Sequence, residues 1–295
     1  MSVATADKPA EITIARARLT PRRLVTTLAV LLAVLLILTA IAIAVGSERV
    51  ELGAVLKIIA AELTGGAADA PPEQRVIIAD IRLPRVLLAI LVGAALSVAG
   101  ATFQALLRNP LADPGILGVS TGAAVGAIVA TIFAESVPLS RPVAAFVGAL
   151  LTLGMVYSIG QSRQGAASER LILAGVITNT FLSSLVIFLL TTATGARLRS
   201  VFAWLIGDLS GDVKLLPIAA ALIFAGIVVI YLHARSLNLL MTGEQDALAL
   251  GVEVERVKMI MYAAASLITG AAVAVSGVIG FVGLIIPHAV RLTGG

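Results

Sequence analysis

The 295-residue chain contains no cysteine. Disulfides, thiolate metal sites and cysteine nucleophiles are therefore excluded together. Charge is also scarce, because only 13% of the residues are Asp, Glu, Lys or Arg, compared with about 25% in typical soluble domains. Hydrophobic residues make up 59% of the chain. These proportions indicate that water is not the main solvent of the folded protein.

Seven long runs contain no Asp, Glu, Lys, Arg or His. They are residues 24–45, 86–107, 115–134, 143–160, 171–192, 215–232 and 259–276. Their lengths are close to the roughly 20 residues that a helix needs to cross a bilayer core. Each must be helical there, because backbone polar groups find no water in lipid. An eighth run, 278–290, is shorter and contains Gly280, Gly283 and Pro287, which suggests a partial or broken span. We predict an all-α, polytopic transmembrane bundle.

The N-terminal segment 1–23 is basic, with Lys8, Arg16, Arg18, Arg22 and Arg23 ahead of the first apolar run. Positive charge flanking a first span favours a cytoplasmic N-terminus, and the run is longer than that of a cleaved signal peptide. We therefore predict a cytoplasmic segment 1–23 followed by one transmembrane domain, 24–295. The net charge of +4 comes from residues in short loops, a distribution that points to a membrane protein and not to nucleic-acid binding.

Two connections and one repeat carry further structural signals. Residues 50–63 place apolar side chains near helical spacing, which is typical of a helix on the membrane surface. Residues 242–258 are polar with interspersed Leu and Val, and predict two short helices joined at Gly251. A connection this long favours a docking surface. Gly118, Gly122 and Gly126 recur every fourth residue, which predicts close helix packing.

Catalytic and metal motifs are weak. The sequence GVSTG at 118–122 matches G-x-S-x-G, and with His288 as a base Ser120 could belong to an intramembrane hydrolase. That motif requires a strand before the serine, whereas Ser120 begins an apolar helical run. The two histidines, His233 and His288, have no carboxylates clustered beside them, so no metal site is predicted.

The sequence also lacks an energy source for transport. Ion-coupled transporters usually place ionisable or broken-helix sites within their spans, and the seven runs hold no Asp, Glu, Lys, Arg or His. No G-x-x-x-x-G-K-[ST] loop is present to bind ATP. A transporter of this kind must be driven by a separate subunit, and the 242–258 connection is the expected attachment point. An ion-coupled secondary transporter with inverted repeats remains the alternative.

Several motifs extend across residues 24–293. They are IRLPR at 81–85, GAALSVAG at 93–100, QALLRNPLADPGILGVS at 104–120, RLILAGV at 170–176, WLIGDL at 204–209, ALALGV at 247–252 and GVIGFVGLIIPH at 277–288. With these motifs the chain resembles the FecCD-type permeases of bacterial iron-siderophore, haem and vitamin B12 (cobalamin) ABC importers. The resemblance implies a type II importer fold in the bacterial inner membrane. Relatives have ten spans, of which about eight fall within this chain.

The resemblance also implies a function and partners. The chain would be a permease subunit that translocates a metal chelate, most commonly a ferric siderophore, without covalent chemistry or a cofactor of its own. It would work with a second permease subunit in a homodimer or heterodimer, two cytosolic ATPases that use ATP, and an extracytoplasmic substrate-binding protein.

Specific residues follow from the same resemblance. Arg82 and Arg85 would dock the binding protein at the outer surface. The cytoplasmic gate would comprise Asn109, Pro110, Leu111, Ser168 and Glu169. The coupling region 242–258 would contact the ATPase through Glu244, Ala247, Leu248, Leu250, Gly251 and Val252, with the three larger apolar side chains inserting into a cleft.

Overall fold

The computed structural model describes residues 20–46, 48, 50–64, 70–134, 136–160, 168–193, 195–210 and 213–294. The predicted cytoplasmic segment 1–23 is thus described only from Thr20 onward. The helices, in chain order, are α1 (Pro21–Ala44), α2 (Leu52–Thr64), α3 (Pro72–Arg75), the π-helix η1 (Val76–Arg82), α4 (Leu83–Leu106), the 3-10 helix η2 (Pro114–Leu117), α5 (Val119–Phe133), α6 (Ser140–Gly160), α7 (Ser168–Thr192), α8 (Gly195–Ile206), the 3-10 helix η3 (Val213–Leu215), α9 (Leu216–Leu232), α10 (Ala234–Thr242), α11 (Glu244–Ala249), α12 (Val254–Ser276) and α13 (Val282–Gly294).

Within this described part, five helices are long and apolar enough to cross a membrane. They are Pro21–Ala44, Pro72–Leu106, Ser140–Gly160, Arg170–Thr192 and Val254–Ser276. The prediction of an all-α multi-pass membrane protein is confirmed. Two of the seven expected spans differ, however. In the 115–134 run, Gly118 is left-handed and separates η2 from the 15-residue α5, and α9 reaches spanning length only together with α10, at a bend of 55°.

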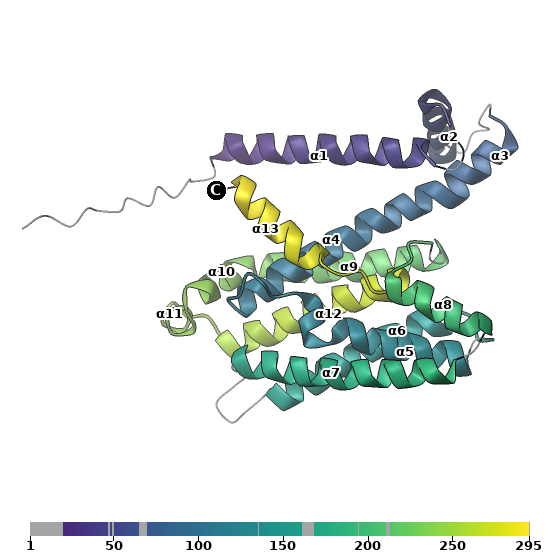
Figure 1. Ribbon diagram of the computed structural model, residues 1–295. Helices are drawn as coiled ribbons and strands as arrows, with labels where there is room; N and C mark the ends of the chain where they lie inside the picture. Colours follow the sequence, from purple (N-terminus) through teal and green to yellow (C-terminus); the bar gives the residue numbers. More distant parts are fainter. Residues whose placement is uncertain are drawn as a thin grey trace, which may run out of the picture.

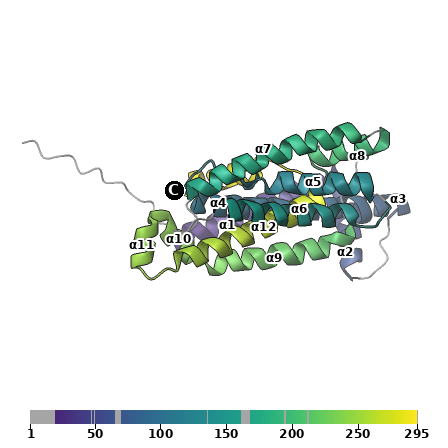
Figure 2. The ribbon, with the colours of Figure 1, turned by 90° about the horizontal axis from the view of Figure 1, so that it is seen from below.

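The two ends of the bundle carry different short elements (Figure 1). The start of α1, α10 and α11 lie at one end, and α2, α3 and α8 lie at the other, an arrangement that the second view repeats (Figure 2). Following the charge-based prediction for the N-terminus, we call the first the cytoplasmic end and the second the outer end.

Helix α1 begins where its sequence provides a cap and is the least covered span. The Thr20 side chain accepts a hydrogen bond from the Arg23 N–H, and Pro21 occupies the first helical position, where its missing N–H has no cost. Only 6% of the apolar window of α1 is buried, which suits a helix facing lipid. The helix expected over 50–63 is present as α2, which packs Val55 and Ile58 against Ile43 of α1, and its place on the membrane surface stays a prediction.

A proline explains the π-helix that leads into α4. Pro84 has no N–H for the Asp80 carbonyl, and its ring would clash with that oxygen in an α-helix. The backbone widens instead over η1, and Leu83 N–H bonds to the carbonyl of Ile78, five residues earlier. The span therefore continues without a break from Pro72 to Leu106. It begins 14 residues before the 86–107 run that the sequence indicated.

Glycines set the distance between α5 and α6. A methyl group added at Gly126 would lie 2.0 Å from the Ala144 carbonyl oxygen, and one added at Gly148 would lie 2.3 Å from the Gly122 oxygen. Any larger residue would force these helices apart. The packing interpretation of Gly122 and Gly126 is confirmed, whereas Gly118 has a φ of +72° and provides the left-handed cap before α5.

Helix α12 forms the centre of the bundle. It contacts α4, α5, α6 and α9, and 72% of its apolar window is buried. Met261, Ala265 and Ile268 are fully buried on it. The helix begins at Val254, five residues before the 259–276 run, because the charged residues that precede the run form its first turns at the cytoplasmic end. Those turns belong to the candidate site.

Candidate coupling and gating site

The site begins at the bend between α9 and α10. His233 ends α9 and its Nδ1 lies 2.9 Å from the Val229 carbonyl oxygen, so this histidine packs against its own helix end. Helix α10 then turns Leu237 and Leu240 into the core. It ends at Gly243, whose φ of +149° suits glycine alone. This break separates α10 from α11 and lets α11 project from the cytoplasmic end (Figure 1).

One face of helix α11 is exposed and apolar, whereas its opposite face is buried against the bundle. Leu248 is 58% exposed, and Leu250, the C-cap residue directly after α11, is 65% exposed, whereas Ala247 is fully buried. Val252 is partly buried and packs against the main core. Leu248 and Leu250 therefore remain candidates for a protein contact. Ala247, which the sequence analysis assigned to that contact, is not accessible and instead holds α11 against the bundle.

The glycine in this region plays a different part from the one predicted. Gly251 has a φ of +82° and open space around its Cα. It joins α11 to the long helix α12 through a short turn, instead of joining two short helices within 242–258. The prediction of two short helices meeting at Gly251 is therefore wrong, and the pair of short helices is α10 and α11, meeting at Gly243.

A network of ion pairs fixes the start of α11. Glu244 Oε2 lies 2.7 Å from Lys258 Nζ on α12, and Glu244 Oε1 lies 3.8 Å from Arg108 Nη2 after α4. Lys258 also lies 3.7 Å from Glu255, and its side chain is only 4% exposed. A buried ammonium group requires paired partners. This burial was not predicted from the sequence, because residues 253–258 have the composition of a solvated polar loop.

The end of α4 forms the first part of the predicted gate. Arg108 adopts a left-handed φ of +48°, and Asn109 Oδ1 accepts a hydrogen bond from the Leu111 N–H at 2.9 Å. Asx turns of this kind reverse the chain locally. Asn109 and Pro110 line an open cavity of about 640 Å³ between α4, α9, α10 and α13, and Leu111 is 67% exposed.

The other part of the predicted gate is described less fully. Ser168 and Glu169 are the first residues of α7, but their side chains lie outside the described residues. The gate roles of all five residues stay predictions.

Helix α13 is held against α4 near this cavity. Gln104 Nε2 donates to the Gly283 carbonyl at 3.3 Å, and Arg291 donates to Gln104 Oε1 at 2.5 Å. A methyl group at Gly100 would lie 1.9 Å from the Gly283 oxygen. Nearby, Asp113 caps η2 by accepting from the Gly115 N–H at 2.8 Å. Burial raises the pKa of the Asp113 carboxyl, and that hydrogen bond opposes the rise.

The two arginines at the outer end have different surroundings. Arg82 is partly buried and its guanidinium donates to the carbonyls of Ile43, Ala44 and Glu48 at 2.7, 3.2 and 2.5 Å. It thereby caps the C-terminus of α1, where a positive charge is favourable. Arg85 is exposed and donates to the Ser210 Oγ at 2.5 Å. Of the two, Arg85 is the residue available to a docking partner, and the docking role stays a prediction.

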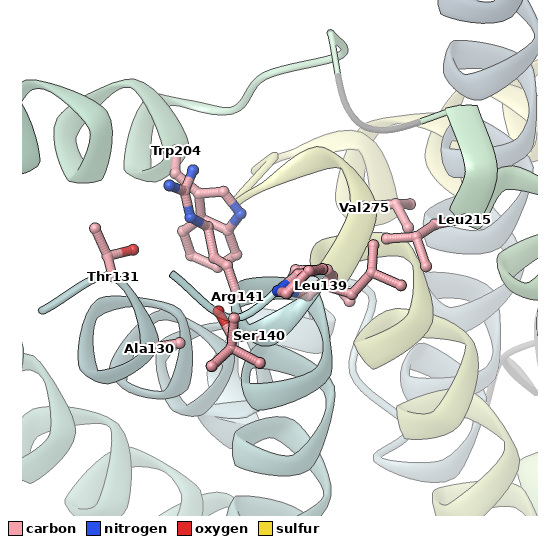
Figure 3. A pocket seen from close by; sticks show the side chains of 12 residues that line it. Ala130, Thr131, Leu139, Ser140, Arg141, Trp204, Leu215 and Val275 are labelled. Carbon is pink, nitrogen blue, oxygen red and sulfur yellow. The ribbon is translucent and has the colours of Figure 1, made fainter. Parts of the chain in front are cut away.

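A second cavity opens at the outer end. It measures about 300 Å³ and lies among α5, α6, α8, η3 and the end of α12. Thr131, Arg141 and Trp204 surround it (Figure 3), and Arg141 donates to Ser200 Oγ at 2.9 Å. Trp204 is the first residue of the WLIGDL motif, but no role for Thr131, Arg141 or Trp204 was predicted from the sequence.

The hydrolase alternative finds no support in the geometry. Ser120 follows the 3-10 helix η2 and the left-handed Gly118, so the strand that a nucleophile elbow requires is missing at this position. His288 is exposed on α13. Among the described residues, no group of three His, Asp or Glu side chains is arranged to hold a metal ion.

These features define a multi-pass membrane protein with a short projecting helix, α11, and an adjacent cavity at one end of its bundle, the architecture of a transport permease. Comparison with known proteins agrees. Residues 34–295 match the model of the FecCD transport family. The chain belongs to this family, as its motifs suggested.

Similar proteins support the assignment. The cobalamin import system permease protein BtuC of Halobacterium salinarum is 44% identical over 76% of this chain and 61% of its own length. The hemin transport system permease protein HmuU of Yersinia pestis is 42% identical over 72% of this chain and 65% of its own length. A Bacillus subtilis ABC transporter permease protein, YvrB, is 42% identical over 86% of this chain and 73% of its own length.

A solved structure shares the fold. It is described as a metal-chelate type ABC transporter in an inward-facing conformation, with a TM-score of 0.76 and 29% identity over 92% of this chain and 82% of that one.

Proposed function

We propose that this chain is a membrane-spanning permease subunit of an ATP-binding-cassette importer, which carries a metal chelate of the ferric-siderophore, haem or cobalamin kind into the cytoplasm. Family membership supports the transport class. The chain performs no covalent chemistry, and ATP is hydrolysed by separate subunits. Ferric siderophore is the first substrate to test, followed by the haem and cobalamin that relatives carry by name.

The observation that carries the proposal is the projecting α11. Leu248 and Leu250 are exposed at the cytoplasmic end, while the adjacent Ala247 is buried. Exposed apolar side chains on a short helix whose opposite face is buried suit insertion into a groove on another protein. An ATPase subunit that receives them can move the permease as a rigid body when its nucleotide sites close.

Partners follow from the two ends of the molecule. The cytoplasmic end would receive the ATPases, and the outer end, with the exposed Arg85, would receive a substrate-binding protein whose carboxylates face this guanidinium. Rim charges of this kind mainly steer association and set its register. A second permease subunit, identical or related, would complete the pathway. The plasma membrane is the expected location.

Reconstituted transport tests the function. The chain is purified with its co-expressed ATPase and binding protein, placed in proteoliposomes, and supplied with labelled ferric siderophore, haem or cobalamin. Uptake that requires ATP and the ATPase supports the proposal. Uptake by the chain alone, driven by an ion gradient without nucleotide, would overturn it in favour of secondary transport.

The apolar contact is tested separately. Leu248→Ser with Leu250→Ser should abolish retention of the ATPase on the purified permease, while the control Leu36→Ala, at an exposed position of α1, should retain it. Retention of the ATPase by the double serine variant would show that α11 is not the docking segment.

A further inference from the structure

One acidic side chain links three separate elements at the cytoplasmic end. Glu244 is the first residue of α11, its carboxylate lies 2.7 Å from Lys258 on α12, and it lies 3.8 Å from Arg108 at the end of α4. Arg108 directly precedes Asn109 and Pro110, which line the cytoplasmic cavity. The same carboxylate therefore joins the docking helix, the central helix and the predicted gate.

The two contacts of Glu244 differ in strength. Lys258 is 4% exposed and Glu244 is 33% exposed, so their short pair is shielded from water. Arg108 is 48% exposed and its contact is longer, and pairs of that kind contribute little on their own. The Glu244–Lys258 pair is therefore the main link, and Arg108 is the weaker branch toward the gate.

The backbone around α11 makes this link mechanically important. The helix has six residues and is bounded by Gly243 and Gly251, with φ values of +149° and +82°. Short glycine-flanked segments can absorb a displacement through backbone rotation, as hinges do. A side-chain link from the first residue of α11 to α12 opposes that rotation.

We infer that Glu244 is a positioning residue for coupling, which makes α11 move together with α12 and the end of α4 when a partner pushes on Leu248 and Leu250. The inference rests on the proposed function, because it assumes that an ATPase docks on α11. Without the carboxylate, the ATPase still binds the exposed leucines, but α11 pivots on its two glycines and the motion is lost before it reaches the gate.

A partner-free measurement tests the link first. Hydrogen exchange of the purified chain in detergent should show faster exchange of the α11 amides in Glu244→Gln than in the unaltered chain, with the middle of α12 unchanged. The matched control is Glu253→Gln, which removes an exposed pair with Arg256 at 3.2 Å and should leave α11 exchange unchanged. Equal exchange in both variants would overturn the inference.

Coupling is then measured in the reconstituted complex as ATP hydrolysed per substrate molecule imported, using whichever labelled chelate the unaltered complex transports. Glu244→Gln should raise this ratio by about 2- to 30-fold, the range typical of mutations within a coupled network. The ATPase should still be retained. Glu253→Gln should leave the ratio unchanged.

A double variant separates coupling from stability. Combining Glu244→Gln with Lys258→Met removes the buried charge as well as its partner, so thermal stability should return toward that of the unaltered chain while the ratio stays high. If thermal stability and the ratio of ATP hydrolysed to substrate imported both returned to the values of the unaltered chain, the inference would be overturned, since Glu244 would then only neutralise a buried lysine. Failure of the unaltered chain to retain the ATPase would overturn the proposed function itself, a different result from retention with an unchanged ratio in Glu244→Gln.

Discussion

The close approach of α4 and α13 gives the sharpest stability prediction. In Gly100→Ala the new methyl carbon would lie 1.9 Å from the Gly283 carbonyl oxygen and 2.5 Å from two further backbone atoms. Because these are backbone atoms, no rotamer change relieves the overlap. To reach the 3.4 Å at which contact becomes ordinary, the helices must separate by about 1.5 Å, the difference between 3.4 and 1.9 Å.

That separation also weakens the polar contact beside it. Gln104 Nε2 donates to the same Gly283 oxygen at 3.3 Å, a length that leaves no room for a further shift. Overpacking typically costs about 1–3 kcal/mol, and a lost hydrogen bond adds about 0.5–1.5 kcal/mol. We expect Gly100→Ala to lower the free energy of unfolding by about 1.5–4.5 kcal/mol from these two effects together.

The same helix provides the matched control. Gly93 lies seven residues earlier on α4 and has no atom within 4 Å of an added methyl, so Gly93→Ala should be neutral or stabilising by up to about 1 kcal/mol through helix propensity. Both variants are unfolded by sodium dodecyl sulfate from mild detergent micelles and followed by circular dichroism. Equal stability of the two variants would refute the close α4–α13 packing.

Three further predictions concern other parts of the bundle. Asp113→Asn keeps the η2 cap, and this variant should be at least as stable as the unaltered chain at neutral pH. Burial raises the folded-state pKa of the Asp113 carboxyl, so the protonated form favours folding. The unaltered chain therefore loses stability as pH rises through that pKa. Flat and equal pH profiles of unfolding for the two proteins would contradict this. Arg82→Ala should lower the free energy of unfolding by about 1.5–3 kcal/mol and speed hydrogen exchange at the end of α1, because charged hydrogen bonds to carbonyls are lost. Arg85→Ala should change stability by less than about 0.5 kcal/mol but weaken binding-protein affinity in a pull-down titration. The reverse pattern would contradict the assignment. Gly277→Ala places a methyl 2.2 Å from a backbone oxygen of α8 at a φ of +67°, so it should cost about 2–4 kcal/mol and shift the fluorescence of the chain's single tryptophan, whereas Gly280→Ala, with open space, should do neither.

Much of the candidate site could be located from the sequence, but few of the contacts between its side chains could be predicted. The 242–258 connection stood out because polar residues interrupt apolar runs, and Leu248 and Leu250 are indeed exposed there. Sequence spacing did not show that Ala247 is buried or that Lys258 lies in a nearly closed environment. Both depend on how α11 folds back on α12, which Gly243 and Gly251 decide through their unusual backbone angles.

By itself, the sequence determined that the chain is a bundle of membrane helices, since long apolar runs without charge have to satisfy their backbone groups internally in lipid. It also predicted close helix packing where glycines repeat on one helical face, although only the structure identified α6 as the partner of Gly122 and Gly126. Only the tertiary structure decided that Gly100 faces a backbone carbonyl 183 positions away while Gly93 faces open space, that Arg82 caps α1, and that Glu244 joins three elements. Local composition determines whether a segment forms a membrane helix. Contacts between distant segments depend on how the helices are placed relative to one another, so two glycines with similar sequence neighbours can have quite different surroundings.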